Sequence, residues 1–239
     1  TTNALSQTYA NGNFLAAGGL YGGNGGKIET SGYHLNISDI AIATTANKGA
    51  TGLWLIDPVD FTVAASGGDM TGSLLTSNLG SANVTILSSS GSSGSDGNIT
   101  INDAVTWSAN KLTLNANNNI YINADLLGSG TAQLDLLYGQ GAVASGNTSD
   151  YSILKTSSGF SASVNLPDGN NFSTKLGSDG STVSYTVISS LSFADTGNFA
   201  FGTNITDAGS YSRGVKNNFS GNIDGLGHTI DGLTIYHPG

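Results

Sequence analysis

Two pairs of aspartates have residue types and spacings that could do acid–base chemistry. Asp57 and Asp60 flank Pro58-Val59, and Asp224 and Asp231 lie seven positions apart near the end of the chain. Two carboxylates with different pKa values can cleave glycosidic bonds. However, Asp57 precedes a proline, and Asp224 and Asp231 each precede a glycine, which are turn-forming combinations. The seven Lys and Arg residues are spread along the chain, so no basic groove for an acidic sugar is indicated. We therefore expect no enzyme activity.

Metal ligation is the second chemistry to consider. His34, His228 and His237 are isolated, with no second histidine or glutamate at ligand spacing. Two turns, 94–98 and 177–180, are rich in Gly, Ser, Asp and Asn, whose oxygens suit Ca²⁺, but neither fits an EF-hand or a calcium-binding nonapeptide. We expect no catalytic, cofactor-binding or metal-binding residues and no cofactor, with a structural Ca²⁺ at one of these turns as the alternative.

Other local patterns indicate structural roles. The glycine-rich stretch 18–26 precedes no helical pattern, so it predicts tight turns and no phosphate site. Asn117–Asn119 predicts either amide ladders between layers or left-handed corner residues. Single outward threonines lack the Thr-x-Thr repeat of an ice-binding face; they are Thr85, Thr100, Thr106 and Thr113. Seven Asn-x-Ser/Thr sequons leave glycosylation open, at Asn36, Asn83, Asn98, Asn147, Asn171, Asn204 and Asn218.

The composition narrows the class of protein. The 239 residues include 35 Gly, three Pro and no Cys, and the net charge is −9. Without a Lys/Arg cluster, nucleic acid and anionic membranes are not expected partners. The absence of Cys excludes thiolate metal sites and disulfides, and it suits a chain that crosses an oxidising periplasm unfolded. No signal peptide and no apolar run of ~20 residues is present. Both ends of the sequence look like cuts through a longer protein.

Short triplets of alternating apolar and polar residues are the elements that must position all these residues. Each has apolar ends and a polar or amphipathic middle residue, which places the outer two side chains on one face of a strand. Helical periodicity is nearly missing. The triplets are Leu35–Ile37, Phe61–Val63, Val84–Ile86, Ile99–Ile101, Val105–Trp107, Leu112–Leu114, Ile120–Ile122 and Leu134–Leu136.

The spacing of the triplets predicts an all-β solenoid. Ile99 and Ile120 are 21 residues apart, Leu112 and Leu134 are 22 apart, and other triplets fall between them. Three short strands per coil of about 20 residues is typical of stacked β-coils, whose apolar faces are buried only against neighbouring coils. We expect regular coils over residues 1–140. Over residues 141–239 we expect a less regular continuation or an appended β module. The Ser/Gly-rich stretch 88–97 is predicted to bulge from one corner as a loop.

Several segments resemble filamentous-haemagglutinin-like exoproteins of two-partner secretion, of the high-molecular-weight adhesin type. The similarity lies first in Gly25–Gly32, Leu35–Ile37, Trp54–Pro58 and Phe61–Val63. It continues through Gly97–Ile101, Trp107–Asn110 and Leu112–Leu114, and Phe219–Ile230 is similar to their GLUG repeat. The family's secretion domain carries Asn-Pro-Asn motifs. No Asn-Pro occurs here, so the resemblance implies a segment from further along such a protein.

This resemblance implies a right-handed parallel β-helix that an outer-membrane transporter exports to the bacterial surface or medium. The expected function is a non-catalytic stalk or adhesive segment that mediates attachment or biofilm formation through a host-cell, glycan or matrix receptor. Two alternatives remain. One is a filament subunit that associates end to end through open coil edges. The other is a glycan-active β-helix enzyme, which would require three or more charged residues in one groove.

Overall fold

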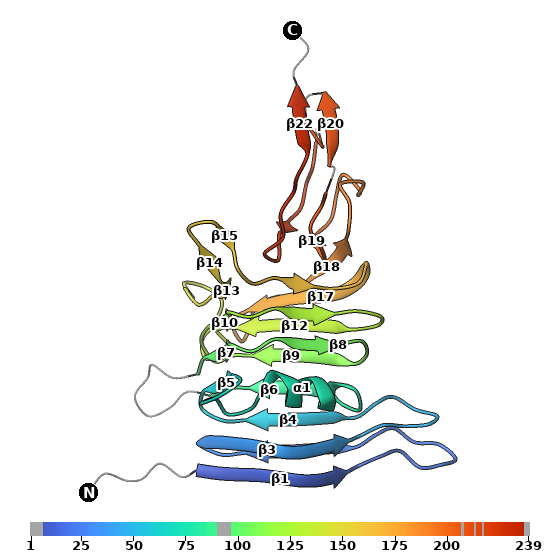
Figure 1. Cartoon of the computed structure of the whole chain (residues 1–239), viewed down its shortest axis with the longest axis vertical. Helices are drawn as coiled ribbons and strands as arrows, with labels where there is room; N and C mark the ends of the chain where they lie inside the picture. Colours follow the sequence, from blue (N-terminus) through green and yellow to red (C-terminus); the bar gives the residue numbers. More distant parts are fainter. Residues whose placement is uncertain (1–6, 90–96, 207, 213, 217, 237–239) are drawn as a thin grey trace, which may run out of the picture.

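The computed structural model describes residues 7–89, 97–206, 208–212, 214–216 and 218–236. It is an elongated stack in which most strands run across the long axis (Figure 1). The first described strand, β1 (Gln7–Leu15), and the last, β22 (Leu233–Tyr236), lie at opposite ends of the stack. Strands dominate the described residues, which contain a single helix, α1 (Gly72–Leu79). The prediction of an all-β protein is confirmed.

One sheet of nine strands runs through most of the stack, in the order β2-β4-β6-β9-β12-β17-β18-β19-β21. From β2 to β17 every neighbouring pair is parallel, whereas β18 runs antiparallel to β17. The bounds are β2 Lys27–Ser31, β4 Leu53–Asp57, β6 Asn83–Leu87, β9 Lys111–Asn115, β12 Gln133–Tyr138, β17 Gly169–Leu176, β18 Val183–Ile188, β19 Phe199–Phe201 and β21 Ile223–Asp224.

Two smaller parallel sheets complete the middle of the stack. Their orders are β13-β10-β7-β5 and β16-β11-β8. Ile99 pairs with Ile120, Val105 with Leu126 and Leu112 with Leu134, so triplets one predicted repeat apart are neighbours. The bounds are β5 Phe61–Val63, β7 Ile99–Ile101, β8 Val105–Trp107, β10 Ile120–Ile122, β11 Leu126–Gly128, β13 Tyr151–Ile153 and β16 Val164–Asn165.

The core is a column of aliphatic side chains between these sheets. Because the pairing is in register, each apolar residue lies against an apolar residue of the next layer. Ile99, Leu112, Ile120 and Leu134, for example, are all fully buried. Burying such a side chain stabilises the fold by roughly 1.5–3 kcal/mol. Trp54 is buried in the same column, and its indole N–H donates to the Thr30 hydroxyl at 3.2 Å. The triplet ends therefore form the core, as alternation predicts.

At the N-terminal end β1 pairs in parallel with β3 (His34–Ala43). Their register shifts so that one residue of β1, Asn11, faces both Ser38 and Asp39 of β3. Asp39 has a φ of 51°, which is uncommon for a residue other than glycine. This β-bulge is the first departure from the regular ladder, and bulges commonly redirect side chains near binding sites.

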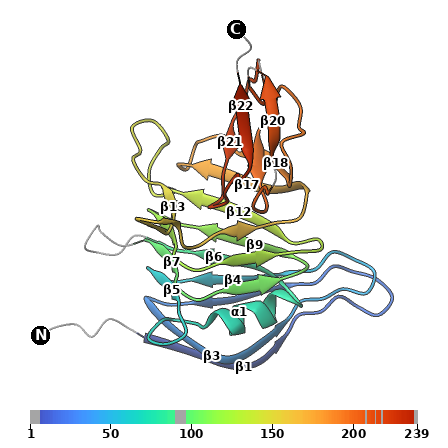
Figure 2. The same ribbon diagram turned by 45° about the horizontal axis from the view of Figure 1, so that its top comes forward.

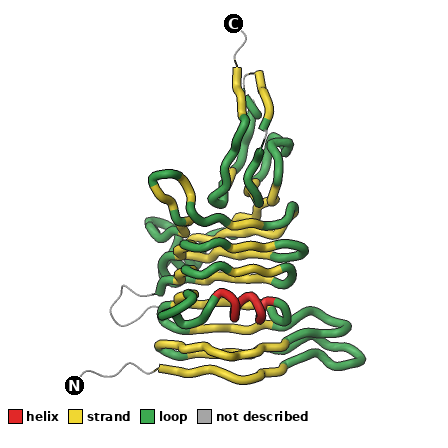
Figure 3. Tube along the Cα trace, in the orientation of Figure 1, coloured by secondary structure: helices red, strands yellow, loops and turns green. Residues whose placement is uncertain are grey.

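The helix α1 was not expected from the sequence, and it occupies a position where other layers have a strand (Figure 3). Thr71 caps its first turn by accepting from the Leu74 N–H at 3.2 Å, and the Asp103 carboxylate accepts from the Gly72 N–H at 2.8 Å. Leu75 and Leu79 are buried. Eight residues are too few to produce a visible helical period. No helix in the described ranges is long and apolar enough to cross a membrane.

The C-terminal part departs from the regular stack and projects from its end (Figure 2). A hairpin, β14 (Lys155–Thr156) and β15 (Gly159–Phe160), follows β13, and β20 (Gly209–Ser212) pairs in parallel with β22. A second apolar cluster lies here, formed by Leu191, Phe201, Ile205 and Ala208. Parallel pairing continues past residue 140 into β17 and changes at β18. The division of the chain at residue 140 stays a prediction.

Candidate functional site

The first aspartate pair has separate structural surroundings. Asp57 ends β4, and its partial burial, with Glu29 as a second cause, raises the pKa of its carboxyl group. Asp60 follows the turn, and its Oδ1 accepts from the backbone N–H groups of Gly97 and Asn98, both at 2.7 Å. Asp60 therefore anchors the chain where it enters β7. This use is consistent with the predicted turn.

The second pair is divided between two places. The Tyr151 hydroxyl donates to Asp224 Oδ2, and the Leu226 N–H donates to Asp224 Oδ1 at 3.0 Å. Asp224 lines a groove of about 290 Å³ together with Asp150, and Asp231 is not part of that groove. Burial, followed by the charge of Asp224, raises the pKa of Tyr151 far above its usual range. Tyr151 therefore keeps its proton at neutral pH and acts as a donor that fastens the C-terminal segment, since a general base would need a lowered pKa.

Tyr151→Phe should lower the free energy of unfolding by about 1.5–3 kcal/mol, because a hydrogen bond to a charged acceptor is lost from a largely buried site. The ring contact with Tyr138, at 5.4 Å between centroids, is retained in this variant. Urea denaturation measures the change. Tyr121→Phe is the matched control, because Tyr121 is 38% exposed and should show no change. Equal stabilities of the two variants would contradict the fastening role.

The histidines lie apart. His34 begins β3 with its ring edge-on to Tyr33, and His237 lies outside the described residues. The His228 Nε2 lies 2.9 Å from the Val164 carbonyl oxygen, and its Nδ1 lies 3.2 Å from Asn204 Oδ1. Burial lowers the pKa of His228, although the Val164 carbonyl and Asp125 oppose the shift. His228 thus ties the segment 219–230 to β16.

The two turns considered as alternatives for a structural Ca²⁺ differ in how many of their residues are described. In the turn 94–98 only Gly97 and Asn98 are described, and both present N–H groups to Asp60. In the turn 177–180 Asp179 Oδ1 accepts from the Ala144 N–H at 2.7 Å, and the Lys175 ammonium donates to the Ser178 carbonyl at 2.9 Å. No group of three or more His, Asp or Glu residues suited to a metal occurs in the described part. A structural Ca²⁺ stays an untested alternative.

The asparagine and threonine patterns have structural roles in the ladders. The Asn123 amide donates to Asn102 Oδ1 at 2.9 Å, and the Asp150 N–H donates to Asn119 Oδ1 at 2.9 Å, so amides do link successive layers. Left-handed backbone occurs at Asn110, with a φ of 67°. Thr85 pairs with Thr113, but the next outward residue in that row is Asp135, so no long threonine array forms.

The glycosylation sequons differ in how accessible their side-chain nitrogens are. The amide nitrogens of Asn83, Asn147 and Asn171 donate to backbone carbonyls. Asn218 is exposed. Because glycosylation modifies the amide nitrogen, the surroundings of Asn204 and Asn218 favour it more than those of Asn83, Asn147 and Asn171.

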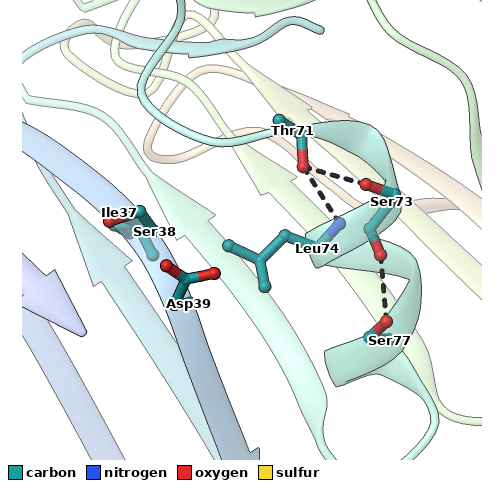
Figure 4. Close-up of a pocket in the computed structure, with 7 residues that line it drawn as sticks. All are labelled: Ile37, Ser38, Asp39, Thr71, Ser73, Leu74 and Ser77. Carbon is teal, nitrogen blue, oxygen red and sulfur yellow. Dashed lines mark hydrogen bonds between the residues drawn. The ribbon is translucent and has the colours of Figure 1, made fainter. Parts of the chain in front are cut away.

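Two grooves coincide with departures from the regular ladder. The first, here called the β3 groove, has a volume of about 310 Å³ and lies between the bulge of β3 and helix α1 (Figure 4). Asp39 and Leu74 face each other across it, and Thr71, Ser73 and Ser77 contribute hydroxyl groups. The remaining lining residues are Ile37 and Ser38. With a single carboxylate and no cation, this groove lacks the paired groups that hydrolysis of a glycan requires.

The second, here called the β17 groove, has a volume of about 340 Å³ on the outer face of the nine-stranded sheet. It lies where the register between β17 and β18 shifts, between Gly169 and Phe172. Its lining, which is polar except for Phe172, comes from four neighbouring strands and the β17–β18 turn. The residues are Lys111, Gln133, Asp135, Asn170, Asn171, Phe172, Ser173, Thr182 and Ser184.

The β17 groove contains one ion pair. Lys111 Nζ lies 2.9 Å from Asp135 Oδ2, and the Ser173 hydroxyl donates to Asp135 Oδ1 at 2.7 Å. Both charges are partly exposed, so we expect the pair to add little to stability. The residues of this groove are not among the candidate catalytic or metal-binding residues that the sequence indicated. The 22-residue spacing of Leu112 and Leu134 would have put Lys111 beside Gln133, but nothing in the sequence indicated the bulge of β17.

The chain matches no known family model, no curated protein sequence and no solved structure.

Proposed function

We propose that this chain is a non-catalytic stalk or adhesive segment of a secreted bacterial surface exoprotein that mediates attachment or biofilm formation. The scaffold proposed for it is a right-handed parallel β-helix with about 20 residues and three short strands per coil. Support comes from the two smaller parallel sheets and from the parallel pairing of β2 through β17 in the nine-stranded sheet. It also comes from hydrogen bonds between residues 21 and 22 positions apart, such as Asn98 with Asn119 and Trp107 with Ser129.

The observation that carries this proposal is the β17 groove. It is open, polar and formed mainly by side chains of neighbouring strands, which hold its donors and acceptors in fixed positions. Such a surface can bind a ligand without any moving part. Its one carboxylate is paired with Lys111 and hydrogen-bonded by Ser173, so it is poorly suited to act as a general acid. Adhesion therefore ranks above hydrolysis.

The groove at Tyr151 is the best argument for the enzyme alternative, because it contains both Asp150 and Asp224. Asp224, however, already accepts two hydrogen bonds from the protein. Retaining and inverting glycosidases need one carboxyl group free to protonate the leaving oxygen. This groove also lacks the third charged residue that the enzyme alternative requires. We rank the enzyme below the adhesive segment.

End-to-end self-association is the second candidate function. Tyr9 and Leu15 on β1 are 69% and 76% exposed, and β1 pairs only with β3 among the described strands. An exposed strand edge of this kind invites pairing. Toward the C-terminal end of the stack, β16 is the edge strand of its sheet, but its Val164 N–H donates to the carbonyl of the buried Leu226. This edge is therefore covered, which opposes continuous stacking.

The proposed export route follows from the resemblance of the chain to two-partner secretion exoproteins. Its partners would be an outer-membrane transporter during export and then a host-cell, glycan or matrix receptor. The chain has seven Lys and Arg residues against 16 acidic ones. With so few cationic side chains, we do not expect such a surface to bind nucleic acid strongly.

Display of the chain on a non-adherent bacterium tests the proposal. We expect more attachment to epithelial cells, matrix-coated wells or plastic than with the same display anchor alone. We also expect no release of reducing sugar from a panel of polysaccharides by the purified chain. Reducing-sugar release without increased attachment would reverse the ranking of adhesion and hydrolysis.

A further inference from the structure

We infer that the β17 groove binds a neutral glycan, in contact with Asn171, Gln133 and Ser184. This inference rests on the proposed adhesive function and names the ligand class for it. Sugar hydroxyl groups act as both donors and acceptors, so a site for them needs donor and acceptor groups side by side. The β17 groove offers amides, hydroxyls, an ammonium and a carboxylate within one volume of about 340 Å³.

Several of these groups are free to bind a ligand. The side chains of Gln133, Thr182 and Ser184 are exposed and have no hydrogen-bond partner in the described part of the chain. The ammonium of Lys111 makes one contact, with Asp135, and can donate two further hydrogen bonds. These groups come from the adjacent strands β9 and β12, from β18 on the far side of β17, and from the turn before β18, and all of them line the same groove.

Asn171 provides the most specific observation. Its Nδ2 donates to the Pro167 carbonyl at 2.7 Å, which fixes the orientation of the amide. Its Oδ1 is buried and has no hydrogen-bond partner. A buried acceptor without a donor costs about 1–3 kcal/mol. A ligand hydroxyl that turned this amide toward the groove would relieve that cost, whereas the first contacts of a ligand fall on the exposed Gln133, Thr182 and Ser184.

The charges of the groove favour a neutral ligand. Lys111 and Asp135 are paired at 2.9 Å, so they cancel locally. The net charge of −9 repels polyanions such as sulfated or uronic-acid polysaccharides. A peptide is a poorer fit, because peptide sites use apolar pockets or an open strand edge. The one apolar residue of the lining, Phe172, is 2% exposed.

Affinity electrophoresis of the whole chain tests the inference. Native gels would contain xylan, mixed-linkage β-glucan, galactomannan or mannan, with heparin and polygalacturonate as acidic comparators. We expect retardation by at least one neutral polysaccharide and by neither acidic one. The double variant Gln133→Ala, Ser184→Ala removes two exposed side chains and should weaken the apparent affinity by about tenfold, as expected for two modest hydrogen bonds.

A charge-matched pair of variants provides the control. Lys111→Met removes the groove cation, whereas Lys27→Met removes the equivalent cation of another outward ion pair on the same sheet, with Glu29 at 2.8 Å. We expect weaker binding for the first and wild-type binding for the second. Asn171→Ala should also weaken binding. The fold of Asn171→Ala is checked by near-ultraviolet circular dichroism. If that fold is lost, the double variant Gln133→Ala, Ser184→Ala tests the inference, because both of its side chains are exposed.

The outcomes separate this inference from the proposed function. Retardation that survives the double variant overturns the β17 groove as the site but leaves adhesion standing. Binding to heparin or polygalacturonate alone overturns the neutral ligand class. Attachment of the displayed chain to cells or matrix protein, without retardation by any polysaccharide, overturns the glycan and supports a protein receptor. Loss of both attachment and retardation overturns the proposed function as well.

Discussion

Asn78→Ala should lower the free energy of unfolding by about 3 kcal/mol or more, because the amide of Asn78 holds helix α1 to β3. Asn78 is 2% exposed. Its Oδ1 accepts from the Ile42 N–H at 2.7 Å, and its Nδ2 donates to the carbonyl oxygens of Ile40 at 3.2 Å and Leu74 at 2.9 Å. Truncation leaves buried backbone groups of β3 unpaired, at a cost of about 1–3 kcal/mol each.

The measurement is urea denaturation followed by tryptophan fluorescence, since Trp54 and Trp107 are both buried in the stack. Ser77→Ala is the matched control on the same helix: Ser77 is exposed and donates to the Ser73 carbonyl at 3.1 Å. We expect the control to stay within about 0.5 kcal/mol of the wild type. A similarly small change for Asn78→Ala would mean that α1 is not fastened to β3 through this amide.

Gly25→Ala should destabilise the protein by more than about 3 kcal/mol, because backbone atoms fill the space that a side chain needs. A Cβ at Gly25 would lie 1.7 Å from the Thr44 carbonyl oxygen and 2.5 Å from the Gly52 nitrogen. The Gly25 N–H also donates to the Ala50 carbonyl at 2.9 Å, so the segment cannot move away without losing a hydrogen bond. These contacts join the loops after β1 and β3, which lie side by side (Figure 1).

Thermal unfolding and the yield of folded protein measure this effect. Gly26→Ala is a graded comparison, because its added Cβ would lie 3.2 Å from the Ala16 Cβ and should cause a milder loss of stability. This variant provides the measurement if Gly25→Ala does not fold at all. Gly225→Ala is the control, with nothing within 4 Å of the added Cβ. If Gly25→Ala were as stable as Gly225→Ala, the close approach of the two loops would have to be wrong.

The two expected losses have the same origin, namely close contact between neighbouring layers. In a stacked β protein each layer is buried only by the layers above and below it. A small change at one contact therefore acts on both neighbours. The exposed side chains of the β17 groove, such as Gln133 and Ser184, lie on the outer surface, where the same constraint does not apply, so they can change without loss of the fold.

Much of the middle of the fold could be predicted from the sequence. The triplets at Ile99, Leu112, Ile120 and Leu134 form the expected strands and lie one repeat apart in register. The alternation of apolar and polar residues is enough to predict the register of these strands, because a slip by one residue would expose every apolar side chain of the strand. The expectation that Asp57 and Asp224 adjoin turns also agrees with the structure.

By itself, then, the sequence determined an all-β chain of short strands and the residues of its core, because burial selects one face of each alternating strand. Helix α1, the bulges of β3 and β17, and the antiparallel strand β18 were decided only by the tertiary structure. Each depends on contacts between residues far apart in the chain, such as Asn78 with Ile42. The β17 groove exists only because the bulge of β17 and the antiparallel strand β18 bring four strands and a turn together around Asn171.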